Sequence, residues 1–462
     1  MVHLGLGAFH RAHQAWYTQH ADPDGAWGIA AFTGRRPDAA LALSAQDGLF
    51  TLIERSDAGD SFEVIRSIVE ANDGADVGRL MDLVAAPSTA LVTLTITEAA
   101  YNLGSDGRLD VADPVVAAEI RTLSRFLAVV ERDQAAAFTG RDQPTTPVGR
   151  LVAGLAARRR SGAGAIAVVP CDNLANNAAA ARAAIRGLAA AVEEDLAEWM
   201  DGNVSFVGTS VDRITPRITP AEVELVAEAT GMRDETPVVA EPFRNWVLSG
   251  AFPAGRPSWD TAGALFVDDI EPFENRKLWL LNGAHSLLAY AGQLRGHTTV
   301  AQALADPACR QWITELWDEA EANLPVPGLD IPGYRAALLE RFGNSRIAHN
   351  LEQIGIDGSS KLRMRAVPVL KAELAAGRSG AGAARMVSAW VDYLRSVRAG
   401  GSAVADSAAG RIGTALALPP GEDTAALLEL LDSSFTGDTS VLQLVESMSG
   451  SFTAASSHQN ND

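Results

Sequence analysis

Short apolar runs alternate with longer stretches of helical periodicity through the first half of the chain. The runs expected to be buried strands are residues 2–7, 27–33, 90–97, 165–170, 204–208 and 237–240. Helical patterns lie between several of them, at residues 8–20, 115–131 and 174–200. This alternation, with nearly continuous apolar strands, predicts a parallel sheet covered by helices on both faces, which is a doubly wound α/β fold.

The second half of the chain is expected to be mostly helical, with patterns at residues 277–292, 309–323, 334–341, 366–376, 383–398 and 424–431. Residues 49–68 instead look like an inserted hairpin or extra strands. With 462 residues the chain exceeds one ordinary core, so two domains are expected. We place the first at residues 1–235 with a linking segment to about residue 270, the second at residues 236–450, and a disordered polar tail at residues 451–462.

Composition narrows the classes of partner. The net charge of −19 disfavours nucleic acid as a partner, because nucleic-acid binding depends on Lys and Arg neutralising phosphates.

The sequence has no run of about 18 uncharged apolar residues that could span a bilayer, and no secretory signal is recognisable. The cytoplasm is therefore the expected location. Cys171 and Cys309 lie outside any CxxC or Cys/His cluster, so neither a disulfide framework nor a metal site is expected. An anionic substrate would need a local cluster of cations.

The stretch "HLGLGAFHRAHQAWY" runs from a predicted strand into a predicted helix and places Gly5 and Gly7 at the turn. In dinucleotide-binding folds such glycines let the backbone approach the pyrophosphate, which rests on the helix N-terminus. The turn, with Ala8 and Phe9, is therefore a candidate cofactor-binding segment. His10 stands where the usual GxGxxG motif has its third glycine, so an ordinary turn between a strand and a helix remains an alternative.

The end of the second predicted strand, "AAFTGRRPD", bears on the choice between NAD and NADP. An acidic residue at this point would bind the ribose hydroxyls of NAD. Arg35 and Arg36 stand there instead, and they could hold the extra phosphate of NADP or be solvated loop charges. Asp38 is an acidic candidate that comes late in the loop.

The segment "KLWLLNGAHSLLAY" is apolar over most of its surface but carries an amine, an amide and an imidazole. At about 100° per residue of α-helix, Lys277, Asn282 and His285 fall within about 140° of arc, and Glu274 falls inside the same arc. A buried lysine would have a lowered pKa and could act as a general base, while an amide could steady an alkoxide. The alternative is a set of satisfied polar groups on an interdomain face.

Two polar candidates follow predicted strands of the first half. Asn173, in "CDNLANN", follows residues 165–170, and Asp212, in "VDRITP", follows residues 204–208. Because ligands of open α/β sheets bind beyond the carboxyl ends of the strands, both are expected to meet the polar helix across a cleft. The motifs YxxxK, GxSxG and HExxH are absent, so a lysine-centred, metal-free dehydrogenase fits best.

Several segments together resemble the mannitol dehydrogenase and fructuronate reductase family of long-chain, metal-independent polyol dehydrogenases. They occur in order between Val2 and about Leu370 and include "HLGLGAFHRAHQAWY", "TLTITEAAY", "CDNLANN", "VDRITP", "EPFRNWVLSGAF" and the K-x4-N-x2-H pattern that begins at Lys277. The last pattern and the FHRAH start are highly specific to that family. The resemblance implies NAD as the cofactor, with hydride passing between the substrate carbinol carbon and nicotinamide C4.

The resemblance also implies roles for the matching residues. Lys277 would be the general base in alcohol oxidation and the general acid in ketone reduction. Asn173, which would also lie beside the cofactor, and Asn282 would form the oxyanion hole, and His285 would orient a substrate hydroxyl.

Three acidic residues match further functional positions of the family. Asp212 would lie on the substrate or nicotinamide side of the cleft. Glu98 and Glu274 match carboxylates implicated in proton passage to the lysine, with a salt-bridge role as the alternative. The form "TEAAY" departs from the more usual TExGY beside Glu98.

The segment "RIAHNLEQIGIDGSSK" bears on the substrate. Mannitol-oxidising relatives are expected to have an aspartate and an arginine where His349 and Gln353 stand, four residues apart on one helical face. Here the pair resembles the fructuronate reductase branch. Lys361 matches a lysine of the family's substrate pocket, while Arg363 and Arg365 could supply charge for a carboxylate or be surface charges.

These features lead to one leading expectation and two alternatives. The leading one is an NAD(H)-dependent oxidoreductase of sugar acids or sugar alcohols, with D-mannonate and D-fructuronate as the expected pair. The first alternative is a dehydrogenase of a neutral polyol, mannitol or arabinitol. A non-catalytic protein that binds sugar or nucleotide is the remote alternative. A monomer is expected, and NADP stays open because of Arg35.

Overall fold

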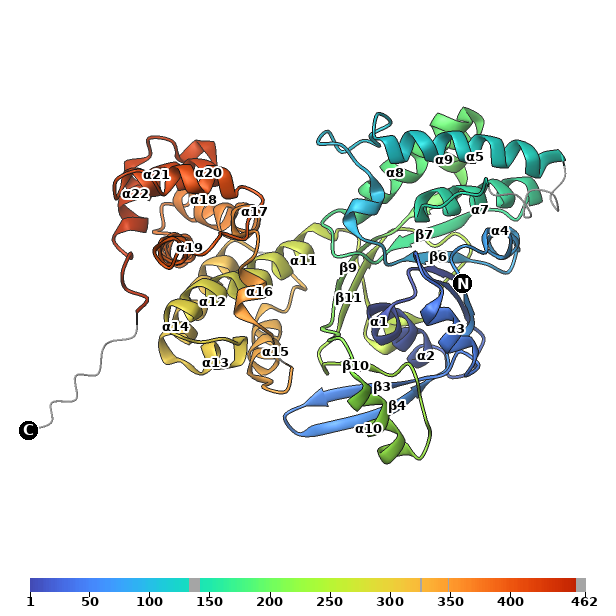
Figure 1. The fold of residues 1–462 in the computed structure, drawn as a ribbon, viewed down its shortest axis with the longest axis horizontal. Helices are drawn as coiled ribbons and strands as arrows, with labels where there is room; N and C mark the ends of the chain where they lie inside the picture. The colour runs from blue at the N-terminus through green and yellow to red at the C-terminus, as the bar shows by residue number, and fades with distance from the viewer. Residues whose placement is uncertain (133–141, 325, 348, 454–462) are drawn as a thin grey trace, which may run out of the picture. The chain divides into compact units, whose positions relative to one another are not determined.

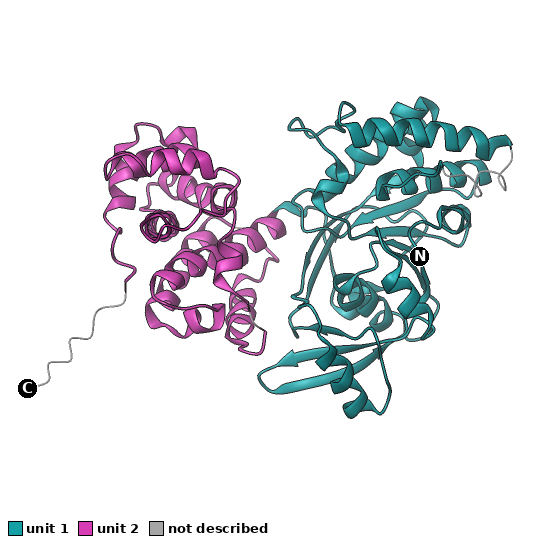
Figure 2. Ribbon diagram, in the orientation of Figure 1, with its two compact units in different colours: residues 1–271 teal, residues 272–462 magenta. Residues whose placement is uncertain are grey.

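The computed structural model describes residues 1–132, 142–324, 326–347 and 349–453 (Figure 1). The chain divides into two compact units, residues 1–271 and residues 272–462 (Figure 2). The expected disordered tail falls mostly on residues 454–462, which lie outside the described residues. None of the helices described is both long enough and apolar enough to cross a membrane.

Unit 1 is built on a six-stranded sheet in which every pair of neighbours is parallel. Its order is β5-β2-β1-β6-β7-β8, formed by Ile68–Asn72, Ile29–Phe32, Val2–Leu4, Leu91–Leu94, Ile166–Pro170 and Val204–Phe206. All residues of β1, β2, β6 and β7 are buried. Strands buried on both faces explain why the sequence shows continuous apolar runs there.

Each face of this sheet belongs to a separate hydrophobic core. Val2 and Leu4 of β1 join one core with five helices: α4 (Val77–Ala85), α5 (Pro114–Arg132), α7 (Pro147–Ser161), α8 (Asn177–Val192) and α9 (Glu194–Asn203). Ile29 and Ala31 of β2 join the other core with α2 (Trp16–His20) and α3 (Asp38–Ser44). Helices cover both faces (Figure 1), which confirms the predicted doubly wound α/β fold.

Two predicted helices of unit 1 differ in detail from the expectation. The pattern at residues 8–20 forms α1 (Ala8–His10), a π-helix η1 (Arg11–Ala15) and α2 in direct succession. The pattern at residues 174–200 is two helices, because Glu193 takes an extended conformation between α8 and α9.

Two three-stranded sheets complete unit 1. One joins the predicted hairpin, β3 (Phe50–Ser56) and β4 (Gly59–Ile65), to β10 (Val238–Ala240). The other joins β9 (Gly208–Asp212), β11 (Asn245–Ser249) and β12 (Leu265–Phe266). Short helical segments accompany them: η2 (Glu98–Tyr101), α10 (Pro220–Thr230) and η3 (Trp259–Ala262). Unit 1 includes the segment expected to link the two domains, residues 236 to about 270, because β10 and β11 pair with its earlier strands.

Apart from an isolated β-bridge between Thr299 and Asn350, the described secondary structure of unit 2 is helical, which confirms the predicted helical second domain. Its elements are α11 (Glu271–Arg276), η4 (Lys277–Asn282), α12 (Gly283–Leu294), α13 (Val300–Ala305), α14 (Pro307–Ala322), α15 (Ile331–Gly343), α16 (Leu351–Gly355), α17 (Gly358–Arg365), α18 (Val367–Ala375), α19 (Ala381–Ala399), α20 (Ala409–Ala415), α21 (Glu422–Leu431), η5 (Ser433–Phe435) and α22 (Thr439–Glu446). All residues of α12 from Gly283 to Gly292 are buried, because α14, α16 and α19 surround it. An apolar helix of this kind is typical of a core position.

Candidate active site

The glycine turn of unit 1 leads from β1 into the continuous helical segment of residues 8–20. Gly5 has a φ angle of +113°, and a Cβ atom there would collide with the carbonyl oxygen of Thr95, so only glycine fits. Gly7 caps the helix in extended backbone and makes no side-chain cap hydrogen bond. The N–H groups of Ala8 and Phe9 therefore have no intrahelical acceptor, and with the positive end of the helix they suit a dinucleotide pyrophosphate.

Two histidine rings fill the space beneath this turn. The nitrogens of His3 hydrogen-bond with the hydroxyls of Thr93 at 2.8 Å and Thr95 at 3.0 Å. The ring of His10 stacks on His3 with centroids 3.3 Å apart. Burial lowers the pKa of His3 to about 3 and holds the pKa of His10 well below its ordinary value, so both rings are neutral at pH 7. His10 thus packs under the turn where the usual motif has a third glycine.

The loop after β2 carries exposed charges. Arg35 is exposed, and Arg36 forms an ion pair with Asp38 at 3.3 Å, with both side chains more than two-thirds exposed. A pair so exposed contributes little to stability. Both sequence interpretations of Arg35, a phosphate ligand and a solvated charge, are compatible with this position.

Asn173 lies exposed just after β7, and the residue before it anchors the loop. The Asp172 carboxylate is buried, and it accepts hydrogen bonds from the hydroxyl of Tyr101 and from a backbone N–H of the loop after β6 at 2.6 Å. Tyr101 ends η2, the short helix that begins with the exposed Glu98. Asp172 therefore ties together the loops that present Glu98 and Asn173. Its place inside the motif "CDNLANN" was the only sequence signal for it.

Asp212 is placed differently from the expectation. Strand β8 ends at Phe206, and residues 208–212 form β9, where Asp212 pairs with Asn245 of β11. Asp212 thus ends a strand of a separate sheet and does not follow β8 in a loop. The start of β9 is fixed by Asn177, whose side chain exchanges two hydrogen bonds of 2.9 Å with the backbone of Thr209.

In unit 2 the polar helix begins with a π-helix, so the expected α-helical geometry is wrong for its first six residues. A π-helix joins residues five apart by a hydrogen bond. It therefore brings Lys277 and Asn282 nearly above one another, and His285 follows three residues later in α12. Lys277 and Asn282 are half-buried and His285 is buried. The π and α spacings together are compatible with one polar face, which stays a prediction.

Two side chains from neighbouring helices hold the backbone of this turn. Trp317 of α14 donates its indole N–H to the carbonyl of Leu280 at 2.8 Å. Arg365 of α17 donates to the carbonyl of Asn282 at 3.2 Å and to the hydroxyl of Ser286 at 2.9 Å. Such partners stabilise carbonyls where the helical register changes.

The ring of His285 is neutral and enclosed. It lies 4.7 Å, between centroids, from the rings of both Phe342 and His349. Burial, followed by the electrostatic effects of His349, Arg341, Arg365 and Lys361, holds the pKa of His285 well below its ordinary value. Its Nε2 atom is buried without a hydrogen-bond partner in the described part of the chain. A neutral ring with a free nitrogen can bind a substrate hydroxyl.

His349 and Gln353 do not share a helical face, because α16 begins only at Leu351. The backbone before it is extended, and its carbonyl at His349 accepts the N–H of Val300 at 3.0 Å. His349 contacts His285, whereas Gln353 is exposed on α16. The expectation of one helical face is therefore wrong, since pairing with a distant segment interrupts the helix.

The basic residues after "DGSS" lie in different environments. Lys361 is half-buried and donates to the carbonyl of Ile354 at 2.9 Å. Burial, followed by the charge of Arg365, lowers the pKa of Lys361. Arg363 is exposed, but Arg365 is largely enclosed beside η4, so the surface interpretation holds for the first arginine only.

Glu274 lies on α11, half-buried and three residues before Lys277. It is therefore on the same side of the helical segment, one turn earlier. No group of three or more His, Cys, Asp or Glu side chains among the described residues is arranged to hold a metal ion.

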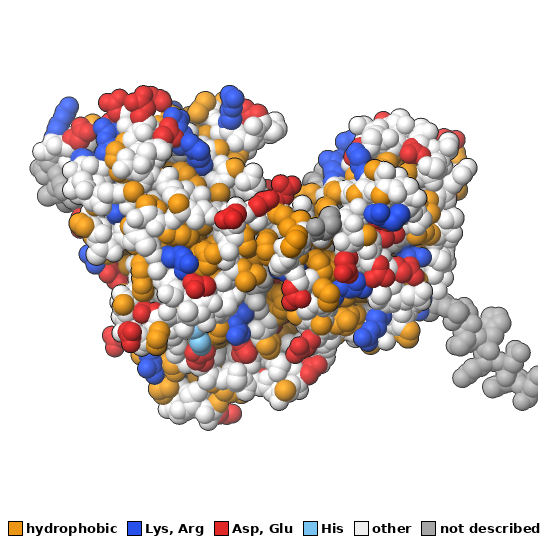
Figure 3. Space-filling model, turned by 180° about the vertical axis from the view of Figure 1, so that it is seen from behind, with side chains coloured by type: hydrophobic (Ala, Val, Ile, Leu, Met, Phe, Trp, Pro, Cys, Tyr) orange, Lys and Arg blue, Asp and Glu red, His pale blue; other side chains and the backbone are white. Residues whose placement is uncertain are grey.

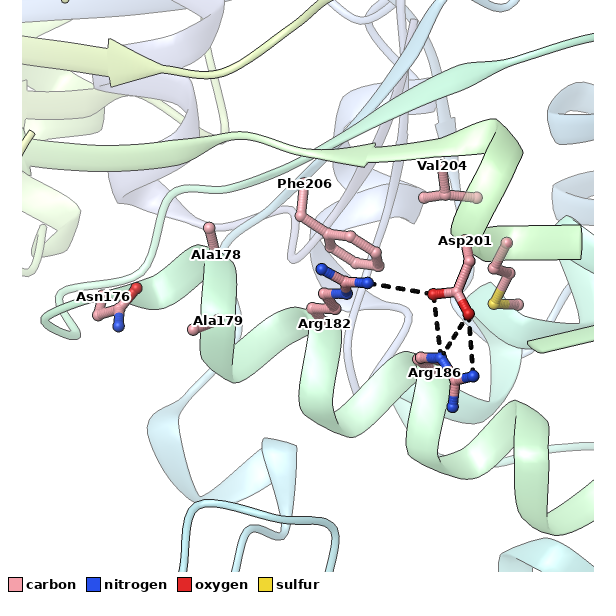
Figure 4. Close-up of a pocket in the computed structure, with 9 residues that line it drawn as sticks. Asn176, Ala178, Ala179, Arg182, Arg186, Asp201, Val204 and Phe206 are labelled. Atoms are coloured by element: carbon pink, nitrogen blue, oxygen red, sulfur yellow. Dashed lines mark hydrogen bonds and ion pairs between the residues drawn. The ribbon is translucent and has the colours of Figure 1, made fainter. Parts of the chain in front are cut away.

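A hollow of about 370 Å³ in unit 1 contains none of the expected site residues. Figure 4 shows that Arg182 and Arg186 of α8 both point to Asp201, with nitrogen to oxygen distances of 2.9 to 3.1 Å. These cations are therefore already neutralised. Acidic and basic side chains are likewise interspersed over the face drawn in Figure 3.

Comparison with known proteins identifies relatives along nearly the whole chain. Residues 1–261 match the mannitol dehydrogenase Rossmann domain, and residues 269–452 match the mannitol dehydrogenase C-terminal domain. D-mannonate oxidoreductase of Escherichia coli is 36% identical over 419 residues, which cover 87% of this chain and 82% of that protein. D-arabinitol 4-dehydrogenase of Ralstonia nicotianae is 35% identical over 404 residues, covering 85% and 83%.

Among solved structures, Pseudomonas fluorescens mannitol 2-dehydrogenase in a ternary complex with NAD and D-mannitol is similar to this chain. Its TM-score is 0.76 at 33% sequence identity, and the match covers 97% of this chain and 91% of that chain.

Proposed function

The chain belongs to the mannitol dehydrogenase family, and from that premise we propose that it is an NAD(H)-dependent oxidoreductase of a sugar acid. The proposed reaction interconverts D-mannonate and D-fructuronate. The similarity to D-mannonate oxidoreductase supports this choice of substrate.

One observation carries the choice of an anionic substrate, namely the charge around His285. The side chains that most affect the pKa of His285 are all basic: His349, Arg341, Arg365 and Lys361. This local positive charge occurs in a chain whose net charge is −19. A carboxylate would be attracted to such a cluster, whereas a neutral polyol would gain nothing from its charge.

Lys277 is the proposed acid and base. Its amine removes the proton of the reacting hydroxyl during oxidation, and its ammonium returns a proton during reduction. The amides of Asn282 and Asn173 stabilise the oxygen as negative charge develops on it. NAD, when bound, accepts the hydride of the carbinol carbon. The free nitrogen of His285 binds a neighbouring hydroxyl and fixes the substrate's orientation.

The remaining family positions receive supporting roles in this proposal. Glu98 and Glu274 pass protons between Lys277 and solvent. Asp212, His349, Gln353 and Lys361 contribute to substrate binding.

Cofactor binding is assigned to the glycine turn. The N–H groups of Ala8 and Phe9 bind the pyrophosphate, and Gly5 and Gly7 leave room for it. The exposed Arg35 keeps NADP as an alternative. Catalytic efficiencies measured with NAD and with NADP decide, and a strong preference for NADP contradicts the assignment.

A dehydrogenase of neutral polyols is the second candidate. The D-arabinitol 4-dehydrogenase and the mannitol 2-dehydrogenase are 35% and 33% identical to this chain, close to the 36% of D-mannonate oxidoreductase. Sequence identity alone therefore does not separate the substrates.

Steady-state rates on D-mannonate, D-mannitol and D-arabinitol, followed by NADH absorbance, test the proposal. We expect the highest kcat/KM for D-mannonate. An enzyme that oxidises only the neutral polyols contradicts the proposed substrate and supports the second candidate. A protein that oxidises none of the three contradicts both.

A further inference from the structure

The guanidinium of Arg365 lies at the backbone of the helix that carries Asn282 and His285. Its Nη1 atom donates to the carbonyl of Asn282 and to the hydroxyl of Ser286. Its Nε atom is inaccessible to solvent and has no hydrogen-bond partner among the described residues. The residue as a whole is half-buried.

Arg365 forms no ion pair with a carboxylate in the described part of the chain. Two buried arginines of unit 1 are neutralised or saturated, whereas Arg150 and Arg276, like Arg365, each keep a buried Nε atom without a partner among the described residues. Arg213 pairs with Glu54 at 2.7 Å, and Arg158 donates to six backbone carbonyls. An enclosed guanidinium without an anion costs free energy, which binding of an anion would recover.

Arg365 remains charged at neutral pH. Burial lowers its pKa only to about 10. A second cation, Lys361, is close enough for the charge of Arg365 to lower the lysine pKa. The neutral ring of His285 does not offset either charge. An anion bound here would therefore relieve repulsion between two cations as well as the burial of one.

We propose that Arg365 binds the carboxylate of the substrate and so determines the preference for sugar acids over neutral polyols. The inference rests on the proposed function and adds a residue to it. The N–H groups of Nη2 are not used by the described residues, so they can donate to a carboxylate oxygen.

The geometry also explains how the carboxylate is positioned relative to the reacting oxygen. The Nη1 atom of Arg365 donates a hydrogen bond to the backbone carbonyl of Asn282. The side-chain amide of the same residue is the proposed oxyanion donor. One side chain therefore fixes the donor and holds the far end of the substrate. Precise relative placement of two binding groups favours a single orientation of the substrate.

Arg365→Gln tests this role, with Arg363→Gln as the matched control. Arg363 is exposed two residues away on the same helix and donates to the carbonyl of Leu430 at 2.6 Å. We expect Arg365→Gln to raise the KM for D-mannonate about 10- to 100-fold, the effect of losing a hydrogen-bonded charge. Its kcat at saturation should change far less, and KM values for NAD and for any neutral polyol should change by less than about 3-fold.

Arg365→Lys keeps a positive charge but not the fork of N–H groups, and it should recover part of the affinity. The inference is overturned if Arg365→Gln and Arg363→Gln have the same KM for D-mannonate. It is also overturned if Arg365→Gln lowers kcat with an unchanged KM, because that result assigns Arg365 a purely structural role. If Arg365→Gln fails to fold, an Arg365→Lys variant with wild-type kcat and a raised KM supports the inference, and one with a wild-type KM opposes it.

Failure of the proposed function is distinguishable from failure of this inference. A wild-type enzyme that does not oxidise D-mannonate contradicts the proposed function. D-mannonate binding, measured by calorimetry with NAD present, then decides the role of Arg365. Binding that Arg365→Gln abolishes supports the inference, and absence of binding to the wild-type protein overturns it.

Discussion

Replacing Asp172 with asparagine should make the protein more stable at neutral pH. Burial raises the pKa of Asp172 from 3.8 to about 6, although hydrogen bonds from Tyr101 and from a backbone N–H act in the opposite direction. At about 1.4 kcal/mol for each pKa unit, ionisation of Asp172 costs the folded state about 3 kcal/mol relative to the unfolded chain. Asparagine has the same shape and can hydrogen-bond to both partners, but it carries no charge to desolvate.

The sign of the pH dependence follows from the two pKa values. The folded state holds the proton of Asp172 more tightly than the unfolded chain does, so the cost is absent below about pH 4. It grows as the pH rises toward about 6 and is complete above that value. The advantage of Asp172→Asn over the wild-type protein should therefore grow by about 3 kcal/mol between pH 4 and pH 7.

Urea unfolding at both pH values measures this difference, through the free energy of unfolding extrapolated to water. Asp38→Asn is the control, because Asp38 is an exposed residue of the same unit. Its effect should differ by less than about 0.5 kcal/mol between the two pH values. The reasoning about Asp172 is refuted if its substitution changes stability equally at both.

Three further substitutions test the turn, the π-helix and the proton transfer. Gly5→Ala should destabilise unit 1 by at least about 2 kcal/mol in thermal unfolding, because φ is +113° and the methyl group would collide with Thr95; an unchanged Tm refutes this. Trp317→Phe removes a donor from the Leu280 carbonyl and should cost about 1 to 3 kcal/mol in urea unfolding; an unchanged free energy of unfolding refutes this. Lys277→Met should lower kcat about a thousandfold with calorimetric NAD binding retained; a wild-type kcat contradicts its role.

The parallel sheet and the helical second unit could be predicted because burial on both faces leaves a local signal. The strands β1, β2, β6 and β7 are continuous apolar runs, and α14 and α19 have clear helical periodicity. The family resemblance, drawn from short motifs, is confirmed by the two family matches.

The small sheets were harder to predict because their pairing is long-range. Strand β9 continues after β8 with only Val207 between them, and nothing local separates the two. Its partner β11 lies more than thirty residues later, at Asn245–Ser249. A similar distant pairing, between Val300 and His349, keeps α16 from starting before Leu351. His349 therefore lies outside the helix that carries Gln353. Contacts of this kind are set by the whole fold and not by the neighbouring residues.

The sequence could name candidate polar residues for a site, but it could not say which of them are buried. Asp172 and Asn173 are adjacent, yet one is buried as an anchor and the other is exposed. Arg363 and Arg365 are two residues apart, and only the second is enclosed. Burial depends on which side of a helix or loop packs against another element. The pattern of residue types does not predict which side that is.

The spacing of the K-x4-N-x2-H motif carries more structural information than an α-helical interpretation allows. Residues five apart on an α-helix point about 140° away from one another, so a straight α-helix would turn Lys277 away from Asn282. The π-helix removes this divergence because its hydrogen bonds join residues five apart. Asn282 and His285 are then three apart on an α-helix, which again places them on one side. The motif thus combines a π spacing with an α spacing, and the donors from Trp317 and Arg365 stabilise the turn where the two meet.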